Sequence, residues 1–85
     1  MSKASRLHLA RVAALPCACC GDAGVQVHHI REGQGLAQRA SDWLVIPLCP
    51  LCHTGPNGAH GDKALMKVYK TSELQMLANT IEKLQ

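Results

Sequence analysis

Two pairs of cysteines, each separated by two residues, are the first feature of this sequence that could do chemistry. Cys17 and Cys20 form one pair, and Cys49 and Cys52 form the other. A turn with two intervening residues lets both thiolates reach one ion, and zinc prefers four such soft ligands in a tetrahedron. The spacing therefore predicts a structural Zn²⁺ bound by all four cysteines. Cys19 is left over, because a ligand there would break the two-residue spacing.

A bound metal matters because the chain is short. It has 85 residues with one Trp, one Tyr and no Phe, so its core must be built from Leu, Ile, Val and Ala. A core of this size rarely supplies more than roughly 3–5 kcal/mol, whereas zinc binding contributes on the order of 10 kcal/mol in zinc-finger peptides. The odd number of cysteines argues against a closed disulfide framework. Buried cysteines without a ligand are the alternative.

Four histidines near the cysteine pairs are not needed by the predicted zinc site. His28 and His29 are adjacent, and His53 and His60 follow the second pair. Neighbouring residues in a strand point to opposite faces, so His28 and His29 divide two roles unless the strand ends or bends there. One ring would coordinate a metal, and the other would act as a general base towards water, for which an unperturbed pKa of about 6.5 is suitable. His60 lies beyond a flexible Gly-Pro-Asn-Gly loop, and a loop or helix-terminal residue is its alternative; His8 is given no site role.

The elements that must position these residues are short. The pattern favours a helix over residues 5–15, a strand over 25–30 and a buried strand over 43–48. A glycine-containing loop is expected over 32–39, and a further helix from residue 60 or 61 to 69.

The last helix has the strongest signals. Ser72 is a good N-cap and Gln75 is placed to complete a capping box. Its apolar residues repeat at helical spacing: Leu74, Leu77, Ile81 and Leu84.

The formal net charge is +3, a mild positive bias that is compatible with nucleic acid but also with a solubilising charge pattern. The N-terminus lacks the apolar block of a signal peptide, and no apolar run is long enough to span a membrane. A cytoplasmic location without a membrane partner is expected, where thiols stay reduced.

The order of these motifs resembles the zinc-ribbon-bearing HNH nucleases, in which a β-hairpin and a helix surround a catalytic metal. The chain is most similar to the Ref family, recombination-enhancement nucleases of phages and prophages that cut DNA where a RecA filament is present. The similarity covers roughly residues 15–61. It is carried by the segments PCACC at 16–20, HHIREGQGLAQRAS at 28–41, IPLCP at 46–50 and HG at 60–61.

This resemblance implies a fold and two domain parts. The fold is a small α+β, zinc-bound ββα-metal (HNH-like) core with a short β-hairpin and flanking helices. A basic N-terminal segment covers residues 1–15, and the zinc-bound HNH-like nuclease domain covers 16–85.

The resemblance also implies roles for the histidines. His29 would be the general base, while His28, His53 and His60 would surround a catalytic divalent metal, which is Mg²⁺, Mn²⁺ or Zn²⁺. The four paired cysteines would hold the structural zinc.

Two positions depart from the family pattern. Many HNH proteins carry an Asn that orients the base in the strand before the second cysteine pair, and the corresponding place here is about Leu44. Ser41 and Asp42 are substitutes on position alone. The fourth zinc ligand is often His in the family and is Cys52 here, but either residue can bind zinc.

The predicted function is that of a metal-dependent DNA endonuclease of HNH type, acting in phage or prophage recombination with a RecA filament as partner. DNA would be contacted mostly through its phosphates. The residues expected to do so are Arg31, Arg39, Lys3, Arg6 and Arg11. The alternative is a non-catalytic zinc-ribbon module that binds nucleic acid or protein, which leaves the histidines idle. A redox role for the pair Cys17–Cys20 is weaker, because it leaves the second pair unexplained and no βαβ pattern surrounds the first.

Overall fold

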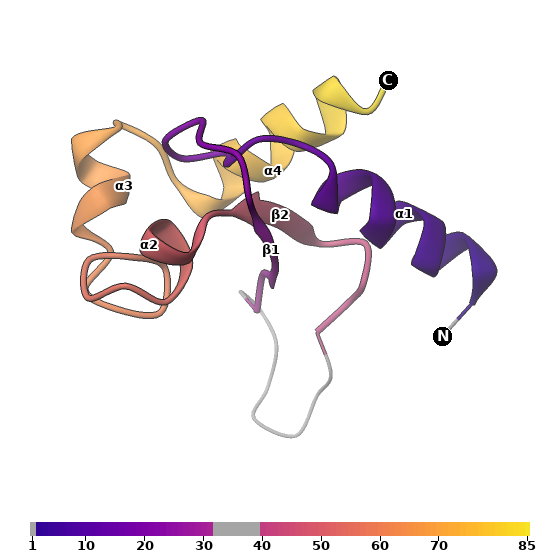
Figure 1. Cartoon of the computed structure of the whole chain (residues 1–85), viewed down its shortest axis with the longest axis horizontal. Coiled ribbons are helices and arrows are strands. Elements are labelled where there is room, and N and C mark those ends of the chain that lie inside the picture. The colour runs from indigo at the N-terminus through magenta and orange to yellow at the C-terminus, as the bar shows by residue number, and fades with distance from the viewer. Residues whose placement is uncertain (1, 32–39) are drawn as a thin grey trace.

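A two-stranded antiparallel sheet lies at the centre of the fold, with helices around it (Figure 1). The computed structural model describes residues 2–31 and 40–85; the loop expected at 32–39 lies outside them. The arrangement is the small α+β class that the sequence predicts. The elements in chain order are α1 (Lys3–Ala13), β1 (Gln26–His29), β2 (Val45–Leu48), α2 (Pro50–His53), α3 (Ala64–Val68) and α4 (Glu73–Lys83).

β2 is the most buried element. Its register runs from Gln26 opposite Leu48 to His29 opposite Val45, and all four of its residues are buried. The helices α1 and α4 pack against it. The carbonyl of Pro47 accepts a hydrogen bond from the Ala18 N–H at 2.8 Å, so the first cysteine turn is fixed to β2. The core also contains two methionines, which were not among the expected Leu, Ile, Val and Ala: Met66 and Met76.

α1 begins two residues before the predicted start, because the Ser2 hydroxyl accepts a hydrogen bond from the Ser5 N–H at 3.0 Å. Its one fully buried apolar side chain is Val12, and Leu7 is exposed. The guanidinium of Arg11 donates to the carbonyl of Leu84. The basic N-terminal segment is therefore packed onto the sheet and joined to the end of α4.

The expected buried strand over 43–48 is shorter than predicted, since β2 begins at Val45. Trp43 is half exposed, and its ring stacks on His8 with the centroids 4.6 Å apart. α2 has four residues and starts at a proline, so it is too short for any periodicity to predict it. None of the described helices has the length and apolar character needed to cross a membrane.

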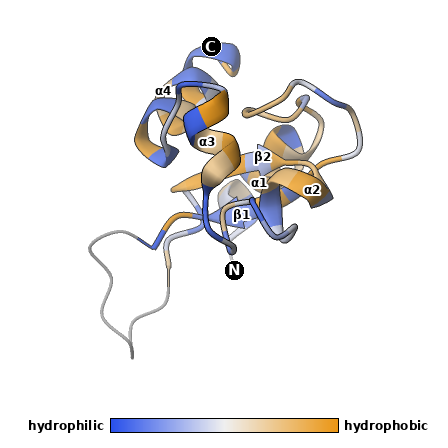
Figure 2. Cartoon of the chain, turned by 90° about the vertical axis from the view of Figure 1, so that its left-hand side faces the viewer, coloured by the Kyte–Doolittle hydropathy of each residue, from blue (hydrophilic) through white to orange (hydrophobic). Residues whose placement is uncertain are grey.

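α4 starts where predicted, and Ser72 caps it by accepting from the Gln75 N–H at 3.1 Å. The prediction that Gln75 completes a capping box is wrong, because its side-chain amide instead donates to Oδ1 of Asn79 at 3.0 Å. Hydrophobic and hydrophilic residues alternate along α4 in Figure 2. The predicted apolar stripe is buried only in part: Leu77 packs against the core, whereas Leu74 and Ile81 are exposed, at 59% and 46%. The core instead takes Met76 and Thr80, and the Thr80 hydroxyl can be buried because it donates to the Met76 carbonyl at 2.8 Å.

Residues 54–63 form a compact turn, which includes the Gly-Pro-Asn-Gly segment at 55–58 that the sequence predicted as a flexible loop. Backbone hydrogen bonds run from Ala59 N–H to the Cys52 carbonyl at 2.8 Å and from His60 N–H to the His53 carbonyl at 2.9 Å. A Cβ on Gly58 would lie 2.7 Å from the Cys52 carbonyl carbon and oxygen. Only glycine allows this contact, so the turn lies directly against the second cysteine pair.

The helix expected from residue 60 or 61 begins later, at Ala64. Lys63 has a φ of 63°, which lies in the left-handed region and interrupts the helical path. The Asp62 carboxylate accepts from the Ala64 N–H at 2.9 Å and so provides the hydrogen bond that starts α3.

We expect Gly58→Ala to destabilise the protein by about 3 kcal/mol, because the new methyl group meets backbone that belongs to the second cysteine pair. Gly24→Ala is the matched control. It has open space around its Cβ and a φ of +78°, so it should lose only about 1 kcal/mol from backbone strain. Urea unfolding followed by circular dichroism measures both, and equal losses would contradict the close packing of this turn.

Candidate metal centre and active site

The four paired cysteines come together in one cluster. The Sγ atoms of Cys17, Cys20, Cys49 and Cys52 all lie within 4.8 Å of one another, and those of Cys20 and Cys49 are 3.6 Å apart. Sulfur ligands of a tetrahedral zinc with bonds of about 2.3 Å are separated by about 3.8 Å. The donor set and spacing fit a metal such as zinc. Cys19 stays outside the cluster, with its thiol 3.9 Å from the Leu65 carbonyl.

The four thiols cannot all ionise easily without a cation. Burial raises the pKa of Cys17, but backbone hydrogen bonds, chiefly from Cys20 and Cys49, outweigh it and lower the pKa to about 7. Burial raises the pKa of Cys20 to about 11. Burial and the nearby thiols of Cys49 and Cys20 also raise the pKa of Cys52. The Cys17 thiolate forms readily, whereas Cys20 and Cys52 resist a negative charge that a metal ion would balance.

Three histidines form a second cluster, beside the first. The ligand atoms of His28, His53 and His60 lie within 4.8 Å of one another, and the Nε2 atoms of His53 and His60 are 3.0 Å apart. The Gln26 side-chain oxygen lies 2.8 Å from Nδ1 of His53. Because this oxygen can only accept, Nδ1 carries the proton and Nε2 keeps its lone pair. The described residues thus bring together all three histidines that the sequence predicted as ligands.

His28 is the buried member of this histidine cluster. Its Nε2 lies 3.1 Å from Oε1 of Glu73, at the start of α4. Burial lowers the pKa of His28, although the Glu73 carboxylate acts in the opposite direction. Burial and the nearby rings of His28 and His60 lower the pKa of His53. Neutral imidazoles are the form that binds metal ions.

His29 points away from the histidine cluster, as alternation along a strand requires. Its Nε2 lies 3.0 Å from Oδ1 of Asp42, and its side chain is 38% exposed. An ionised carboxylate only accepts, so Nε2–H donates and Nδ1 is left unprotonated in the neutral ring. Asp42, one of the two residues suggested in place of the Asn that orients the base, thus contacts His29. The Ser41 hydroxyl instead accepts from the Trp43 N–H at 3.1 Å.

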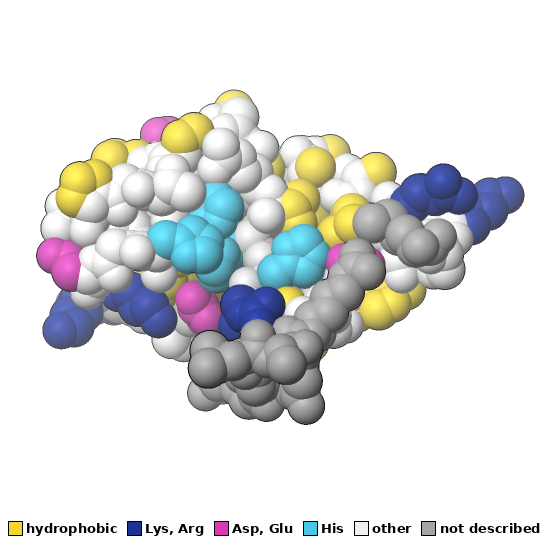
Figure 3. Space-filling model, turned by 90° about the horizontal axis from the view of Figure 1, so that it is seen from below, with side chains coloured by type: hydrophobic (Ala, Val, Ile, Leu, Met, Phe, Trp, Pro, Cys, Tyr) yellow, Lys and Arg dark blue, Asp and Glu magenta, His cyan; other side chains and the backbone are white. Residues whose placement is uncertain are grey.

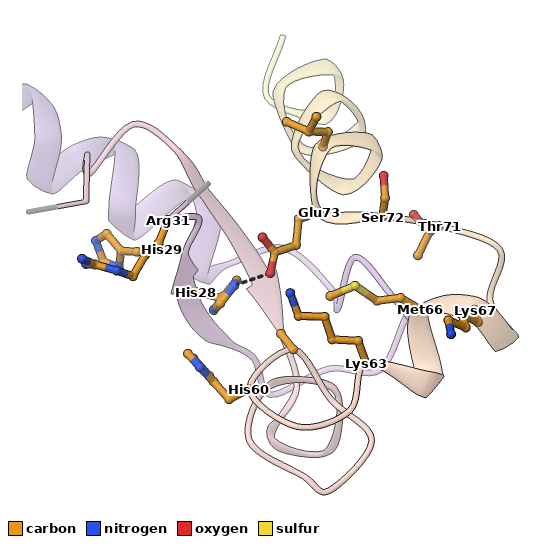
Figure 4. A pocket seen from close by; sticks show the side chains of 12 residues that line it. His28, His29, Arg31, His60, Lys63, Met66, Lys67, Thr71, Ser72 and Glu73 are labelled. Atoms are coloured by element: carbon orange, nitrogen blue, oxygen red, sulfur yellow. Dashed lines mark hydrogen bonds and ion pairs between the residues drawn. The ribbon is translucent and has the colours of Figure 1, made fainter. Parts of the chain in front are cut away.

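The histidine cluster and His29 both border one cleft of about 770 Å³. It is lined by His28, His29 and His60 together with residues of α3 and of the start of α4 (Figure 4). Figure 3 shows the histidine side chains gathered on one face, with acidic and basic side chains next to them. A substrate in this cleft could meet the histidine cluster and His29 at the same time.

The predicted DNA-contacting residues are spread over the molecule. Arg31 lines the cleft. Lys3 and Arg6 lie exposed on α1, Arg11 is bound to the Leu84 carbonyl, and Arg39 lies outside the described residues.

Sequence reasoning missed three residues of the site. Gln26 and Glu73 contact the histidine cluster, and Lys63 lines the cleft. Glu73 follows the N-cap of a helix, where an acidic residue is ordinary, so only the packing of α4 reveals its contact. Gln26 precedes His28 by two positions, so the alternation of β1 was a usable signal that both side chains share one face.

The chain matches the model of the family described as "Protein of unknown function (DUF968)" over residues 2–84, and it belongs to that family. Among curated proteins it is similar to the uncharacterized protein YdfU of Escherichia coli (strain K12), with 36% identity over 70 residues. The match covers 80% of this chain and 19% of YdfU, so the chain spans about a fifth of the length of that relative. No solved structure matches the chain.

Cys17→Ser should leave the chain unfolded or without fixed packing, because it removes one ligand from a site that contributes more than the small core can supply. Circular dichroism and metal analysis, with and without a chelator, measure the effect. Cys19→Ser is the control, and it should keep both the fold and the metal content. A wild-type chain that stays folded after its metal is removed would refute the structural role of the cysteine cluster.

Proposed function

We propose that this DUF968 family member is a metal-dependent DNA endonuclease of HNH type, built on a ββα-metal core with a structural zinc. The observation that carries the proposal is the convergence of three imidazoles beside a fourth, His29, that is held by a carboxylate. The order of elements supports it: two antiparallel strands are followed directly by α2, which bears Cys52 and His53.

His29 has the properties that a general base requires. Asp42 holds its Nε2–H, so the free Nδ1 can accept a proton from an attacking water. The ring is partly exposed, so water and a phosphodiester can reach it. Asp42 then acts as a positioning residue that takes the part of the Asn expected near Leu44.

The three clustered histidines fit a catalytic metal. Nitrogen donors suit Zn²⁺ and similar transition metals better than Mg²⁺, so zinc is the favoured ion among the three considered. A metal held there would neutralise charge on the scissile phosphate and the leaving oxygen. Glu73 fixes the ring of His28, as carboxylates commonly do for metal-binding histidines.

A non-catalytic zinc-ribbon module would need the cysteine cluster but not the histidines. The contacts of Gln26, Asp42 and Glu73 with three different rings are unexplained in that alternative. This favours the nuclease, and absence of cleavage by the metal-loaded protein would favour the module.

His29→Ala should lower the rate of plasmid nicking by about 10²–10⁴-fold, because a positioned base is lost. Zinc content and binding to duplex DNA should stay nearly unchanged, since neither cluster uses this ring. His8→Ala is the control, because it removes a histidine that stacks on Trp43. Nicking of supercoiled plasmid by protein loaded with zinc, manganese or magnesium measures the rates.

Unchanged nicking by His29→Ala would show that His29 is not the base. If His28→Ala still loads metal but alone fails to cut, the roles of the two residues are exchanged.

We further propose that the nuclease acts in phage or prophage recombination and cuts best where a RecA-type filament has paired a strand with the duplex. The described chain extends 35 × 30 × 19 Å, which spans about one turn of DNA. A domain of this size has little surface of its own with which to bend or open a duplex, and a filament that has already deformed the DNA removes that cost.

Nicking should therefore be weak on naked duplex and at least about tenfold faster with filament and a matched oligonucleotide, a difference of about 1.4 kcal/mol in barrier height. An oligonucleotide of unrelated sequence is the control. Equal rates in all three reactions would leave a generic HNH nuclease without dependence on a filament.

A further inference from the structure

Basic side chains outnumber acidic ones in the cleft beside the histidine cluster. Three of its described lining residues are basic, namely Arg31, Lys63 and Lys67, and one is acidic, Glu73. The Glu73 carboxylate is already engaged by His28. The cleft therefore offers positive charge to a ligand that carries negative charge.

Lys63 follows His60 by three residues and lines the cleft. Figure 4 shows its side chain pointing towards His28 and Glu73 from the turn that also carries His60. Within residues 2–31 and 40–85, no carboxylate lies close enough to form an ion pair with its ammonium group. The adjacent Asp62 carboxylate is used within the turn, where it accepts from Asn57 at 3.0 Å.

The backbone fixes the place of Lys63. Its N–H donates to the Gly58 carbonyl at 3.2 Å, in the turn that packs against the second cysteine pair. Its φ of 63° is a conformation that a residue with a Cβ rarely adopts. The backbone of Lys63 is thus held by the same turn that positions His60.

We propose that Lys63 binds a phosphate of the DNA backbone, next to the phosphate that is cut. This inference rests on the proposed nuclease function and names the group that holds its substrate. A lysine ammonium is a compact point charge that suits phosphate. Because this contact depends only on the charge of the phosphate, it should contribute equally to the binding of every DNA sequence.

Lys70 provides a matched control for this proposal. It is also an exposed lysine with a positive φ, of 53°, but it does not line the cleft. Lys63→Gly and Lys70→Gly each remove one positive charge and each allow the backbone to relax. Neither variant should lower Tm, because glycine adopts this conformation readily.

The experiment measures binding of the zinc-loaded protein to a labelled 20-base-pair duplex at several KCl concentrations, by fluorescence anisotropy. Lys63→Gly should reduce the slope of log K against log salt by about 0.9, since one phosphate contact is lost. Its affinity at 0.1 M salt should fall by about eightfold, because a slope difference of about 0.9 acts over the tenfold range between 1 M and 0.1 M salt. Lys70→Gly should bind within about twofold of wild type, and Lys63→Arg should retain binding, because its charge is kept.

The outcomes separate this proposal from the proposed function. If wild type cuts DNA and Lys63→Gly binds like Lys70→Gly, the role of Lys63 is overturned and the nuclease stands. If wild type binds without cutting and only Lys63→Gly is weakened, the phosphate contact stands and the nuclease is wrong. A wild-type protein that binds no duplex at any salt concentration overturns both.

Discussion

The convergence of four thiols on one point is the constraint on which the rest of this structure depends. The first cysteine pair precedes β1 in the chain and the second follows β2. The hydrogen bond from the Ala18 N–H to the Pro47 carbonyl holds the first cysteine turn against β2. Burial, and after it the neighbouring thiols, raise the pKa values of Cys20 and Cys52 and so oppose their ionisation. A cation removes this opposition, so metal binding and folding favour each other.

The candidate active site is built outward from this cluster. His53 follows Cys52 directly, and His60 is tied by its backbone to His53 at 2.9 Å. The position of the histidine cluster is therefore set by the cysteine cluster, over a few residues of compact turn. This arrangement lets a chain with a small core hold several imidazoles in place without a large scaffold around them.

The sequence predicted those parts of the site that depend on local spacing. The cysteine cluster follows from the two-residue separation, the opposite orientations of His28 and His29 follow from strand geometry, and Ser72 follows from capping chemistry. Contacts between distant segments were not predictable in this way. Glu73 reaches His28 only because α4 packs beside the sheet. The path of the turn at 54–63 depends on Gly58 lying against Cys52, so a glycine-rich segment predicted to be a flexible loop is instead closely packed and hydrogen-bonded. The apolar stripe of α4 predicted the core-facing side only in part, because Leu77 packs against the core but Met76 and Thr80 are the buried residues of this helix.

The proline in β2 has a consequence for how the protein behaves in a concentrated solution. In a strand, the N and the C=O of one residue point to the same side, and the Pro47 carbonyl faces away from β1, towards Ala18. Its missing N–H therefore lies on the outer edge of the sheet, where it costs no bond to β1. A strand from another molecule that approached this edge would find one donor absent and one acceptor taken. The sheet thus ends at two strands, and its hydrophobic edge is a poor template for aggregation.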